Sequence, residues 1–417
     1  MYFSLLLPIL LSGAGLFMLI RLRFFFVLHP VRCFRAFLCE LRSPASRRAL
    51  WLALAGTLGV GNIFGVAAGI MIGGAGSIFW LLVSSLFSMV LKYSETALVI
   101  SQKNIGHRGM HTVLETVFSR VGKHLGKFYA FLCLLLSLFM GSAIQSAAFV
   151  DTAQGAFAVS RPTSAILLAL LCLIPIIGGV EKIERASSRL IPLATLVYLL
   201  LSFLSLLRSA DKIPMVLCKI IDDAFCPLAP CGGLLAFFTS RALYEGFARG
   251  LLSNEAGVGT SAMAHSRSSE RSPWVAGLFG ICEVFFDTVL LCGLTGLVIL
   301  SSVNDISSYK TPMSLVVAAF EGLLGGFSIL PLTLCILVFA YSTMICWYYY
   351  GCECSLYLFG AHGTIYTFLF IFFIFIGSVL GHTSLIYASD ILLFLMAVPT
   401  VAVILYRSRE ISELTSS

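Results

Sequence analysis

Charged residues are scarce in this chain, and no long polar stretch separates its apolar segments. Lys, Arg, Asp and Glu make up 11% of the 417 residues, against about 25% in an ordinary soluble domain. Hydrophobic residues make up 59%, and the mean hydropathy is +0.98. This composition excludes a soluble globular domain and indicates a polytopic, all-α membrane protein.

The motifs of most enzymes and of nucleotide sites are also missing. The chain has no G-x-x-x-x-G-K-[ST] phosphate loop, no H-E-x-x-H pair and no nucleophile elbow. Its 13 cysteines include no C-x-x-C pair, so we interpret them as small apolar residues. Cys226 and Cys231 share a predicted outer loop and could pair there. We therefore expect neither an ATP-driven pump nor an enzyme, and no cofactor.

The apolar segments predict about 11 transmembrane helices, since one span takes about 20 residues. They lie near residues 2–22, 50–73, 75–100, 127–157, 163–179, 190–207, 232–263, 274–302, 314–346, 364–381 and 384–406. The segments 232–263 and 314–346 are each long enough to contain two half-helices. The first segment has arginines only near its end, unlike a signal peptide, and is predicted to be retained.

Basic residues concentrate in one alternating set of loops, which predicts the orientation. The loop after the first span alone holds Arg21, Arg23, Arg32, Arg35, Arg42, Arg47 and Arg48. We expect that side to be cytoplasmic, with the N-terminus outside and the C-terminus inside the cell (inner) membrane. The net charge of +7 is then a consequence of topology and does not indicate nucleic-acid binding.

Two apolar segments, one in each half of the chain, are each interrupted by asparagine and glycine. The first interruption spans 59–65 (GVGNIFG) and the second 253–259 (SNEAGVG). Unwound backbone is tolerated at membrane depth mainly where it lines a cavity. Such interruptions at corresponding positions of two halves indicate the binding site of a secondary transporter.

The positions of the interruptions predict a five-plus-five inverted repeat preceded by one extra helix. Residues 1–48 would hold the extra helix and a basic cytoplasmic loop. Residues 49–208 would form the first repeat, with its first helix broken at 59–62, and residues 209–407 the second, with its first helix broken at 253–259. Residues 408–417 would form a cytoplasmic tail.

The half-helix ends suggest how such a site works. Asn62 can cap the second half-helix of the first break, whose N-terminus then suits a carboxylate. The half-helix that ends near Leu58 presents free carbonyls, which suit a small hard cation.

Ionisable residues within spans are functional candidates by default. Glu255 is either functional or a structural partner of the broken backbone. Glu283 and Asp287 lie one helical turn apart and could form a proton site, although we favour a structural role. Lys92 and Glu95 are expected to pair with each other, and Arg241, Glu245 and Arg249 to form a salt-bridge ladder on one helix face.

Several stretches of the chain resemble the alanine or glycine:cation symporter family. They are 59–67 (GVGNIFGVA) with 73–80 (GGAGSIFW), and 249–259 (RGLLSNEAGVG), with weaker similarity at 177–183, 287–288, 342–343 and 347–351. The similarity runs from about Ala49 to Gly360 and implies a LeuT-type fold. It also implies sodium-coupled uptake of alanine or glycine by alternating access, with serine as a further candidate.

The resemblance also implies the residues of the site. The amino acid would contact Gly59, Gly61, Asn62, Gln145, Ser253, Asn254, Thr343 and Trp347. Sodium would be held by backbone carbonyls of Ala55, Leu58 and Phe339 and by the hydroxyls of Ser342 and Thr343.

The chain departs from the family pattern at several positions. Val60 and Ala75 stand where the family usually has Thr and Pro, and a commonly found Gln is missing near Ala276. These differences leave open the choice among alanine, glycine and serine, and sodium or proton as the coupling ion. A channel and a non-transporting membrane sensor remain alternatives, and saturable ion-driven uptake would separate transport from both.

Overall fold

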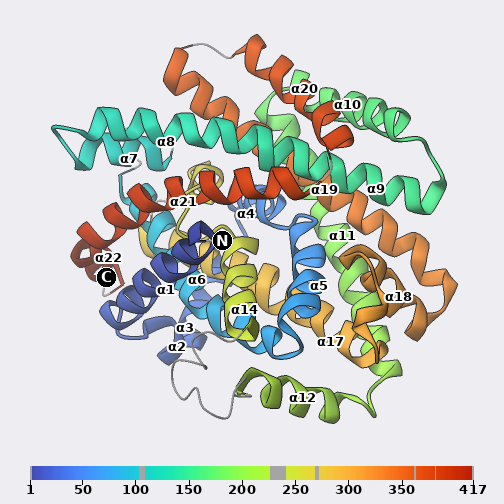
Figure 1. The fold of residues 1–417 in the computed structure, drawn as a ribbon. Helices are drawn as coiled ribbons and strands as arrows, with labels where there is room; N and C mark the ends of the chain where they lie inside the picture. The colour runs from blue at the N-terminus through green and yellow to red at the C-terminus, as the bar shows by residue number, and fades with distance from the viewer. Residues whose placement is uncertain are drawn as a thin grey trace.

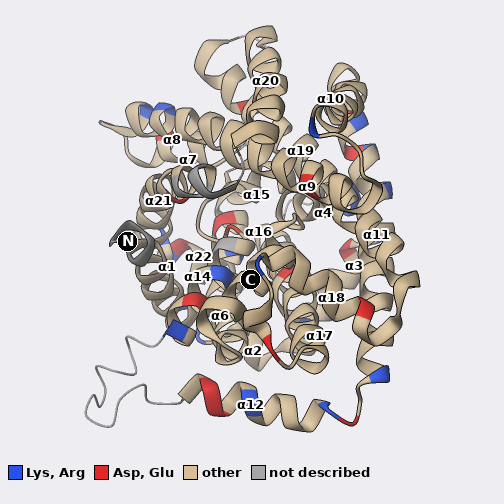
Figure 2. Ribbon diagram, turned by 45° about the vertical axis from the view of Figure 1, so that its right-hand side comes forward, with Lys and Arg blue, Asp and Glu red and all other residues tan. Residues whose placement is uncertain are grey.

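The computed structural model describes residues 2–102, 109–225, 241–267, 272–360, 363–380 and 382–415. Within these ranges the regular elements are all helices, as Figure 1 shows. The expected all-α membrane fold is confirmed, whereas Cys226 and Cys231 lie outside the described residues. Figure 2 shows that Lys, Arg, Asp and Glu are few along the helices.

The first half of the chain contains most of the long helices. Their bounds are α1 Tyr2–Arg21, α2 Phe25–Leu28, α3 Pro30–Glu40, α4 Pro44–Thr57, α5 Gly61–Gly73, α6 Gly76–Ser101, α7 Met110–Val117, α8 Gly122–Leu136, the π-helix η2 Ser137–Ile144, α9 Gln145–Phe157, α10 Arg161–Ile177 and α11 Val180–Arg208. The predicted basic loop before residue 48 is thus largely helical, through α2 and α3.

The second half contains several short helices together with the long helices α19 and α21. Their bounds are α12 Ile213–Phe225, α14 Arg241–Ser253, α15 Ser261–His265, α16 Pro273–Val284, the π-helix η3 Phe285–Cys292, α17 Gly293–Ser302, the 3-10 turn η4 Ile306–Ser308, α18 Pro312–Leu324, the 3-10 turn η5 Gly326–Ser328, α19 Ile329–Phe359, α20 Thr364–Leu380, α21 His382–Tyr406 and α22 Ser408–Leu414.

Seven described helical stretches are long and apolar enough to cross a membrane, and four shorter apolar helices accompany them. The predicted span 190–207 is longer than expected, because α11 already begins at Val180. The predicted segment 314–346 is divided at Gly325, whose φ of 82° favours glycine. The helix α18 ends there, and α19 follows as a separate long helix.

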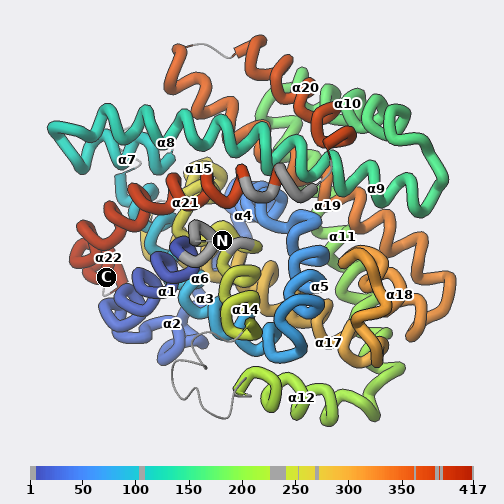
Figure 3. Tube along the Cα trace, viewed as in Figure 1, coloured from blue at the N-terminus to red at the C-terminus, as the bar shows by residue number. Residues whose placement is uncertain are grey.

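The two interrupted helices lie beside each other although they come from different halves of the chain. Helix α14 contacts α5 and α6, and Figure 3 shows α5 and α14 next to each other in the middle of the molecule. The long helix formed by α8, η2 and α9 crosses above them, and α21 contacts both α8 and η2. This arrangement brings both breaks together with η2, η3, α19 and α21.

Helix α12 lies at the edge of the molecule, apart from the central helices (Figures 1 and 2). It is fixed to the start of α6, where the Gly76 amide donates to Asp223 Oδ2 at 2.7 Å and Trp80 Nε1 donates to the Ala224 carbonyl at 3.1 Å. An added Cβ on Gly76 would lie 2.4 Å from the Ala224 nitrogen, so this close contact requires glycine.

Candidate functional site

The first break lies between α4 and α5, where residues 58–60 leave the helical conformation. The C-terminal end of α4 leaves two carbonyl groups free of helical bonds. Both carbonyls are directed at α19. The Thr343 hydroxyl lies 2.9 Å from the Ala55 carbonyl oxygen and 3.4 Å from that of Leu58. The neighbouring Ser342 hydroxyl is fully buried and has no hydrogen-bond partner among the described residues. The Thr343 hydroxyl and two carbonyl oxygens thus meet at the end of α4.

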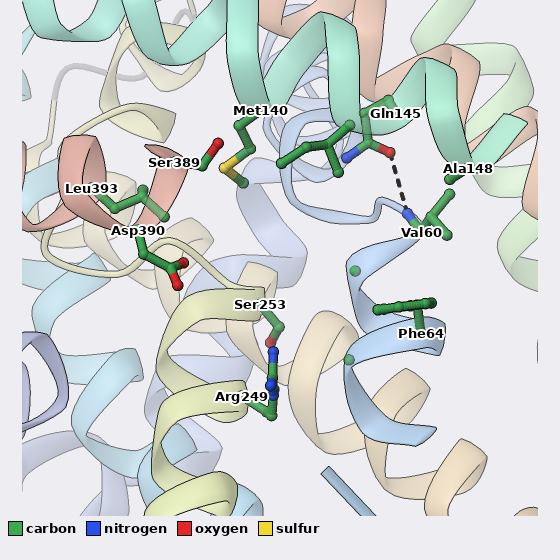
Figure 4. A pocket seen from close by; sticks show the side chains of 13 residues that line it. Val60, Phe64, Met140, Gln145, Ala148, Arg249, Ser253, Ser389, Asp390 and Leu393 are labelled. Carbon is green, nitrogen blue, oxygen red and sulfur yellow. Dashed lines mark hydrogen bonds between the residues drawn. The ribbon is translucent and has the colours of Figure 1, made fainter. Parts of the chain in front are cut away.

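Gly59 allows the backbone of the break to approach two polar side chains. A Cβ at this position would lie 3.1 Å from Thr343 Oγ1 and 3.2 Å from Gln145 Nε2. The next residue, Val60, donates its amide hydrogen to Gln145 Oε1 at 3.5 Å (Figure 4). Of the predicted site residues, Gly59, Gln145 and Thr343 therefore meet at the first break.

The second break, residues 254–260, is held by a carboxylate from another helix. Glu255, Gly257 and Gly259 have φ values of 54°, 77° and 87°, a left-handed conformation that favours glycine and disfavours Glu255. The amides of Gly257 and Gly259 donate to Glu95 Oε2 of α6 at 3.1 and 2.9 Å. We expected Glu255 as one candidate partner of this backbone, but Glu95 takes that place.

The other polar groups around the second break also have partners within the protein. The Val258 carbonyl accepts from the Tyr129 hydroxyl at 2.8 Å and from the Thr400 hydroxyl at 3.2 Å. The Ala256 amide donates to Asn254 Oδ1 at 3.1 Å. Side chains from three helices thus replace the missing helical bonds, as the absence of water in a bilayer requires.

Asp287, in η3, joins the two breaks. It is fully buried and accepts from Asn62 Nδ2 of the first break and, at 3.1 Å, from Ser253 Oγ of the second. Thr288 Oγ1 accepts from Asn254 Nδ2 at 3.0 Å. Asn62 therefore does not cap α5, contrary to our expectation, because it is already within the helix and its amide is directed at Asp287.

A second group of buried charges lies beside the second break. Lys92 Nζ is 3.0 Å from Glu283 Oε1 and 3.7 Å from Glu95 Oε1, and it donates to Ser261 Oγ at 2.8 Å. His265 Nε2 lies 3.1 Å from Glu283 Oε2. The expected Lys92–Glu95 pair is thus present but is longer than the contact with Glu283. Buried charges are stable only when they are paired in this way.

Glu255 has a different partner from these charges. Its Oε2 accepts from the Thr260 hydroxyl at 2.9 Å, within the same break. The predicted salt-bridge ladder on α14 includes the pair Arg249 and Glu245. In the structure, Arg249 Nε contacts Glu245 Oε2 at 3.2 Å. Across the described residues, no group of three or more His, Cys, Asp or Glu side chains is arranged to hold a metal ion.

A cavity of about 140 Å³ opens between the breaks. Figure 4 shows α5 on one side of it and α14 on the other, with Gln145 and Met140 above and the end of α21 opposite. Three of the predicted amino-acid contacts, Gly61, Gln145 and Ser253, line this cavity. The structure therefore brings residues of both breaks to one cavity, whose largely apolar wall carries a few polar side chains.

The other predicted amino-acid contacts lie behind the cavity wall. Asn62 and Asn254 are buried, and they hold Asp287 and Thr288 as described above. Trp347 is also fully buried, and its side chain is packed closely against Gly141 of η2. Trp347 thus does not line the cavity in this conformation.

Sequence reasoning missed three polar residues that line the cavity, namely Arg249, Ser389 and Asp390. The sequence predicts Arg249 as part of a salt-bridge ladder with Arg241 and Glu245, and that pattern does not reveal its place at the cavity. Asp390 is a carboxylate within a predicted span, and such a residue is a candidate by default, so a signal was available. Ser389 carried no signal, since serines are common in transmembrane helices.

Two unwound segments from the two halves of a helical membrane protein that meet beside one cavity are typical of a secondary transporter. The family model described as the sodium:alanine symporter family matches residues 1–417. The chain therefore belongs to this family, and its general activity is cation-coupled amino-acid symport.

Relatives and solved structures agree with this assignment. The chain is 32% identical to an "Uncharacterized transporter" of Haemophilus influenzae, over 98% of this chain and 91% of the relative. It is 29% identical to the "Sodium/alanine symporter AgcS" of Methanococcus maripaludis, over 94% of this chain and 89% of the relative.

Among solved structures, the fold is similar to that of a Na+-coupled sialic acid symporter, with a TM-score of 0.57 and 13% identity, over 97% of this chain and 85% of that one. A manganese transporter of Eremococcus coleocola gives a TM-score of 0.56 and 14% identity, over 88% and 78%. At these identities the likeness concerns the fold alone.

Proposed function

We propose that this protein couples the entry of sodium to the uptake of a small neutral amino acid, alanine or glycine, into the cytoplasm. The single observation that carries the proposal is the group of oxygens at the first break. The Thr343 hydroxyl contacts two freed carbonyls there, directly beside an amino-acid-sized cavity.

The sodium site would consist of the Ala55, Leu58 and Phe339 carbonyls and of the Ser342 and Thr343 hydroxyls. Oxygen ligands suit a small hard cation. The unpartnered Ser342 hydroxyl supports this assignment, because a buried hydroxyl without a partner is costly. A bound cation would give that hydroxyl a partner.

The amino acid would occupy the cavity between the breaks. Its carboxylate would lie at the N-terminal end of α5, close to Gly61, where the helix dipole favours an anion. Gln145 and Ser253 would bind the remaining polar groups. Asn62 and Asn254 would position both breaks through Asp287 and Thr288, and movement of the half-helices would allow alternating access from the two sides of the plasma membrane.

Uptake of radiolabelled alanine and glycine into proteoliposomes tests the proposal, with a sodium gradient, a proton gradient or neither. Accumulation driven by sodium alone is the expected result. Absence of accumulation under every gradient, with folded protein demonstrated separately, would contradict the proposal and favour a sensor or a channel.

Proton coupling on the same fold is the second candidate function. It is favoured by Asp287, a buried carboxylate that contacts both breaks, with Glu255 and Glu283 as further candidates. Accumulation driven by a proton gradient without sodium would support it and would remove Ser342 and Thr343 from the coupling site.

A further inference from the structure

A second cavity, of about 560 Å³, lies at the end of α1 and shares no lining residue with the cavity between the breaks. The end of α1, α2, the start of α3 and α22 form its wall, and Figure 1 shows α1, α2 and α22 on the side of the molecule where the C-terminus lies. Three of its lining side chains, Arg23, His29 and Arg32, carry basic nitrogen groups, and we call it the basic cavity. The proposed transport mechanism uses none of them.

Arg23 occupies a backbone position that disfavours arginine. At the end of α1, the Phe24 amide donates to the Leu19 carbonyl at 3.1 Å and the Arg23 amide donates to the Ile20 carbonyl at 2.9 Å. In this pattern, the Schellman motif, the position of Arg23 is usually taken by glycine. Arg23 has a φ of 52°, a left-handed conformation that is strained for any residue with a Cβ. The turn favours glycine, so what the chain gains from arginine here is its side chain.

The arginines of the basic cavity have no anionic partner within the described part of the chain. The Cζ of Arg32 lies 5.6 Å from the ring centroid of Phe25 and 5.3 Å from that of Trp274. Such stacking holds the guanidinium by its faces and leaves its N–H groups available as donors. The carboxylate that lines the cavity, Glu413, accepts from Arg409 Nε at 3.1 Å. An anion that enters the cavity would therefore find donors that no described carboxylate occupies.

Helix α3 presents an apolar face to the outside directly beside these arginines. Val31, Phe34 and Leu38 lie on one face at helical spacing and are 70%, 61% and 46% exposed. A different face, with Cys33 and Phe37, is buried, and α3 contacts α16. An amphipathic helix of this kind lies in the membrane interface, with its apolar face toward the acyl chains.

The basic surface continues from the cavity onto α3. Arg32 also lines a neighbouring hollow of about 440 Å³, together with Val31 and Arg35. Guanidinium groups and exposed apolar side chains thus adjoin each other over both hollows. The matching ligand combines an anionic group with hydrocarbon.

An anionic phospholipid has this combination. Arginine binds phosphate oxygens through two parallel N–H groups. Inorganic phosphate would leave the apolar face of α3 uncovered, whereas a zwitterionic lipid would bring its own cation close to the arginines. The predicted cytoplasmic location of this loop places it at the leaflet surface that attracts basic segments.

We propose that the basic cavity binds the headgroup phosphate of an anionic phospholipid. Arg23 and Arg32 donate to the phosphate oxygens, and the acyl chains lie along the exposed apolar face of α3. None of these residues belongs to either break, so the proposal does not depend on the identity of the amino acid or of the coupling ion.

Binding of radiolabelled phosphatidylglycerol to the purified full-length protein in a neutral detergent tests the proposal. Unlabelled phosphatidylglycerol should displace the label at a concentration at least about tenfold lower than phosphatidylcholine with the same acyl chains, because each arginine near an anionic lipid is worth about fivefold in affinity. Equal displacement by the two lipids would overturn the proposal. Displacement by inorganic phosphate at the concentration of the lipid would also overturn it, since the ligand would then be a soluble anion.

Two variants locate the lipid at the basic cavity. Arg23→Gln and Arg32→Gln should each weaken the binding of phosphatidylglycerol by about fivefold. Arg185→Gln is the matched control, because Arg185 is exposed on α11 and does not line the cavity. If both cavity variants bound phosphatidylglycerol as tightly as this control, the proposal would be wrong.

Arg23→Gly separates the charge of Arg23 from its structural role. Glycine suits the left-handed turn, so the lipid-free variant in detergent should aggregate at the same temperature as the unmodified protein or at a higher one. Its affinity for phosphatidylglycerol should still fall by about fivefold. Unchanged affinity in this well-folded variant would contradict the proposal, and this variant decides if Arg32→Gln does not fold.

These measurements also distinguish the lipid site from the proposed function. Selective binding of phosphatidylglycerol by a protein that accumulates no alanine would support the basic cavity and contradict only the transport proposal. A protein that accumulates alanine in a sodium gradient but binds phosphatidylglycerol and phosphatidylcholine equally would retain the proposed function and lose this inference.

Discussion

At the scale of single residues, the hydroxyls of Ser342 and Thr343 differ from ordinary helix hydroxyls in the groups that they contact. Hydroxyls in helices commonly bond a carbonyl of their own helix. Thr343 instead contacts carbonyls of another helix, and Ser342 contacts none. The Thr343 hydroxyl is thus directed at the end of α4, and the buried Ser342 hydroxyl adjoins it in the sequence, which is why we place the sodium ion there.

The double variant Ser342→Ala and Thr343→Ala tests that placement. We expect the sodium concentration for half-maximal alanine uptake to rise by about tenfold or more, since each lost contact with a charged ligand costs about 1.5–3 kcal/mol. The measurement is uptake into proteoliposomes over a sodium titration.

Thr333→Ala serves as the control for this double variant. Thr333 is a buried hydroxyl of the same helix, but it is about three turns away from the break. The sodium dependence of alanine uptake by the Thr333→Ala variant should match that of the unmodified protein. An unchanged sodium dependence in the double variant would remove both hydroxyls from the ion site.

At the scale of elements, the two breaks differ in what stabilises them. The backbone of the first break is contacted by neutral side chains, Gln145 and Thr343. The second break depends on the carboxylate of Glu95, which accepts two backbone amides. Charge-assisted hydrogen bonds of this kind are about twice as strong as neutral ones, so the second break should be the more sensitive to a single substitution.

Glu95→Gln tests this dependence of the second break on charge. The variant keeps the size of the side chain but removes the charge that faces two amides and Lys92, so we expect a loss of about 2 kcal/mol of stability. The measurement is the temperature at which half of the detergent-solubilised protein aggregates.

Glu321→Gln is the matched control, because Glu321 is exposed on α18. It should leave the aggregation temperature unchanged. A Glu95→Gln protein as stable as this control would mean that the Glu95 charge contributes little to the second break.

Both breaks could be predicted from sequence because glycine and asparagine interrupt otherwise apolar segments. The π-helices η2 and η3 could not, since their residues are as apolar as those of an ordinary transmembrane helix. Such segments are rare and often occur at functional sites. Here η2 directly precedes Gln145, and η3 contains Asp287, so a prediction based on ordinary helical spacing misjudges where these side chains point.

The cavity wall formed by α21 was missed for a related reason. The Gly and Asn interruptions mark the other two walls of the cavity in the sequence, whereas the α21 segment contains no interruption that would mark Ser389 and Asp390. Their position in the cavity depends on how α21 packs against η2 and α8. That packing is a tertiary property, which the pattern of a single segment does not contain.

At the scale of the whole molecule, the uneven distribution of arginine predicts which ends face the cytoplasm. The structure provides two native probes of this orientation. Cys39 in α3 and Cys218 in α12 are both exposed, and the predicted topology places them on opposite sides of the membrane. Exposed thiols react readily, whereas buried ones are inert.

Labelling of intact cells with a membrane-impermeant maleimide tests the orientation. A variant that keeps Cys218 as its single cysteine should be labelled, and one that keeps only Cys39 should be labelled only after the cells are opened. The reverse pattern would invert the topology and, with it, the proposed direction of uptake.

The buried group of Lys92, Glu95 and Glu283 has a consequence for how this protein is made. Lys92 and Glu95 belong to one helix, whereas Glu283 is synthesised much later in the chain. A single lysine at the middle of a helix costs about 2.5–3.5 kcal/mol during insertion at the translocon. We therefore expect the early helix to enter the bilayer with Lys92 and Glu95 paired with each other, and Glu283 can join them only after α16 has been synthesised. The second half of the chain then completes a charge pairing that the first half begins.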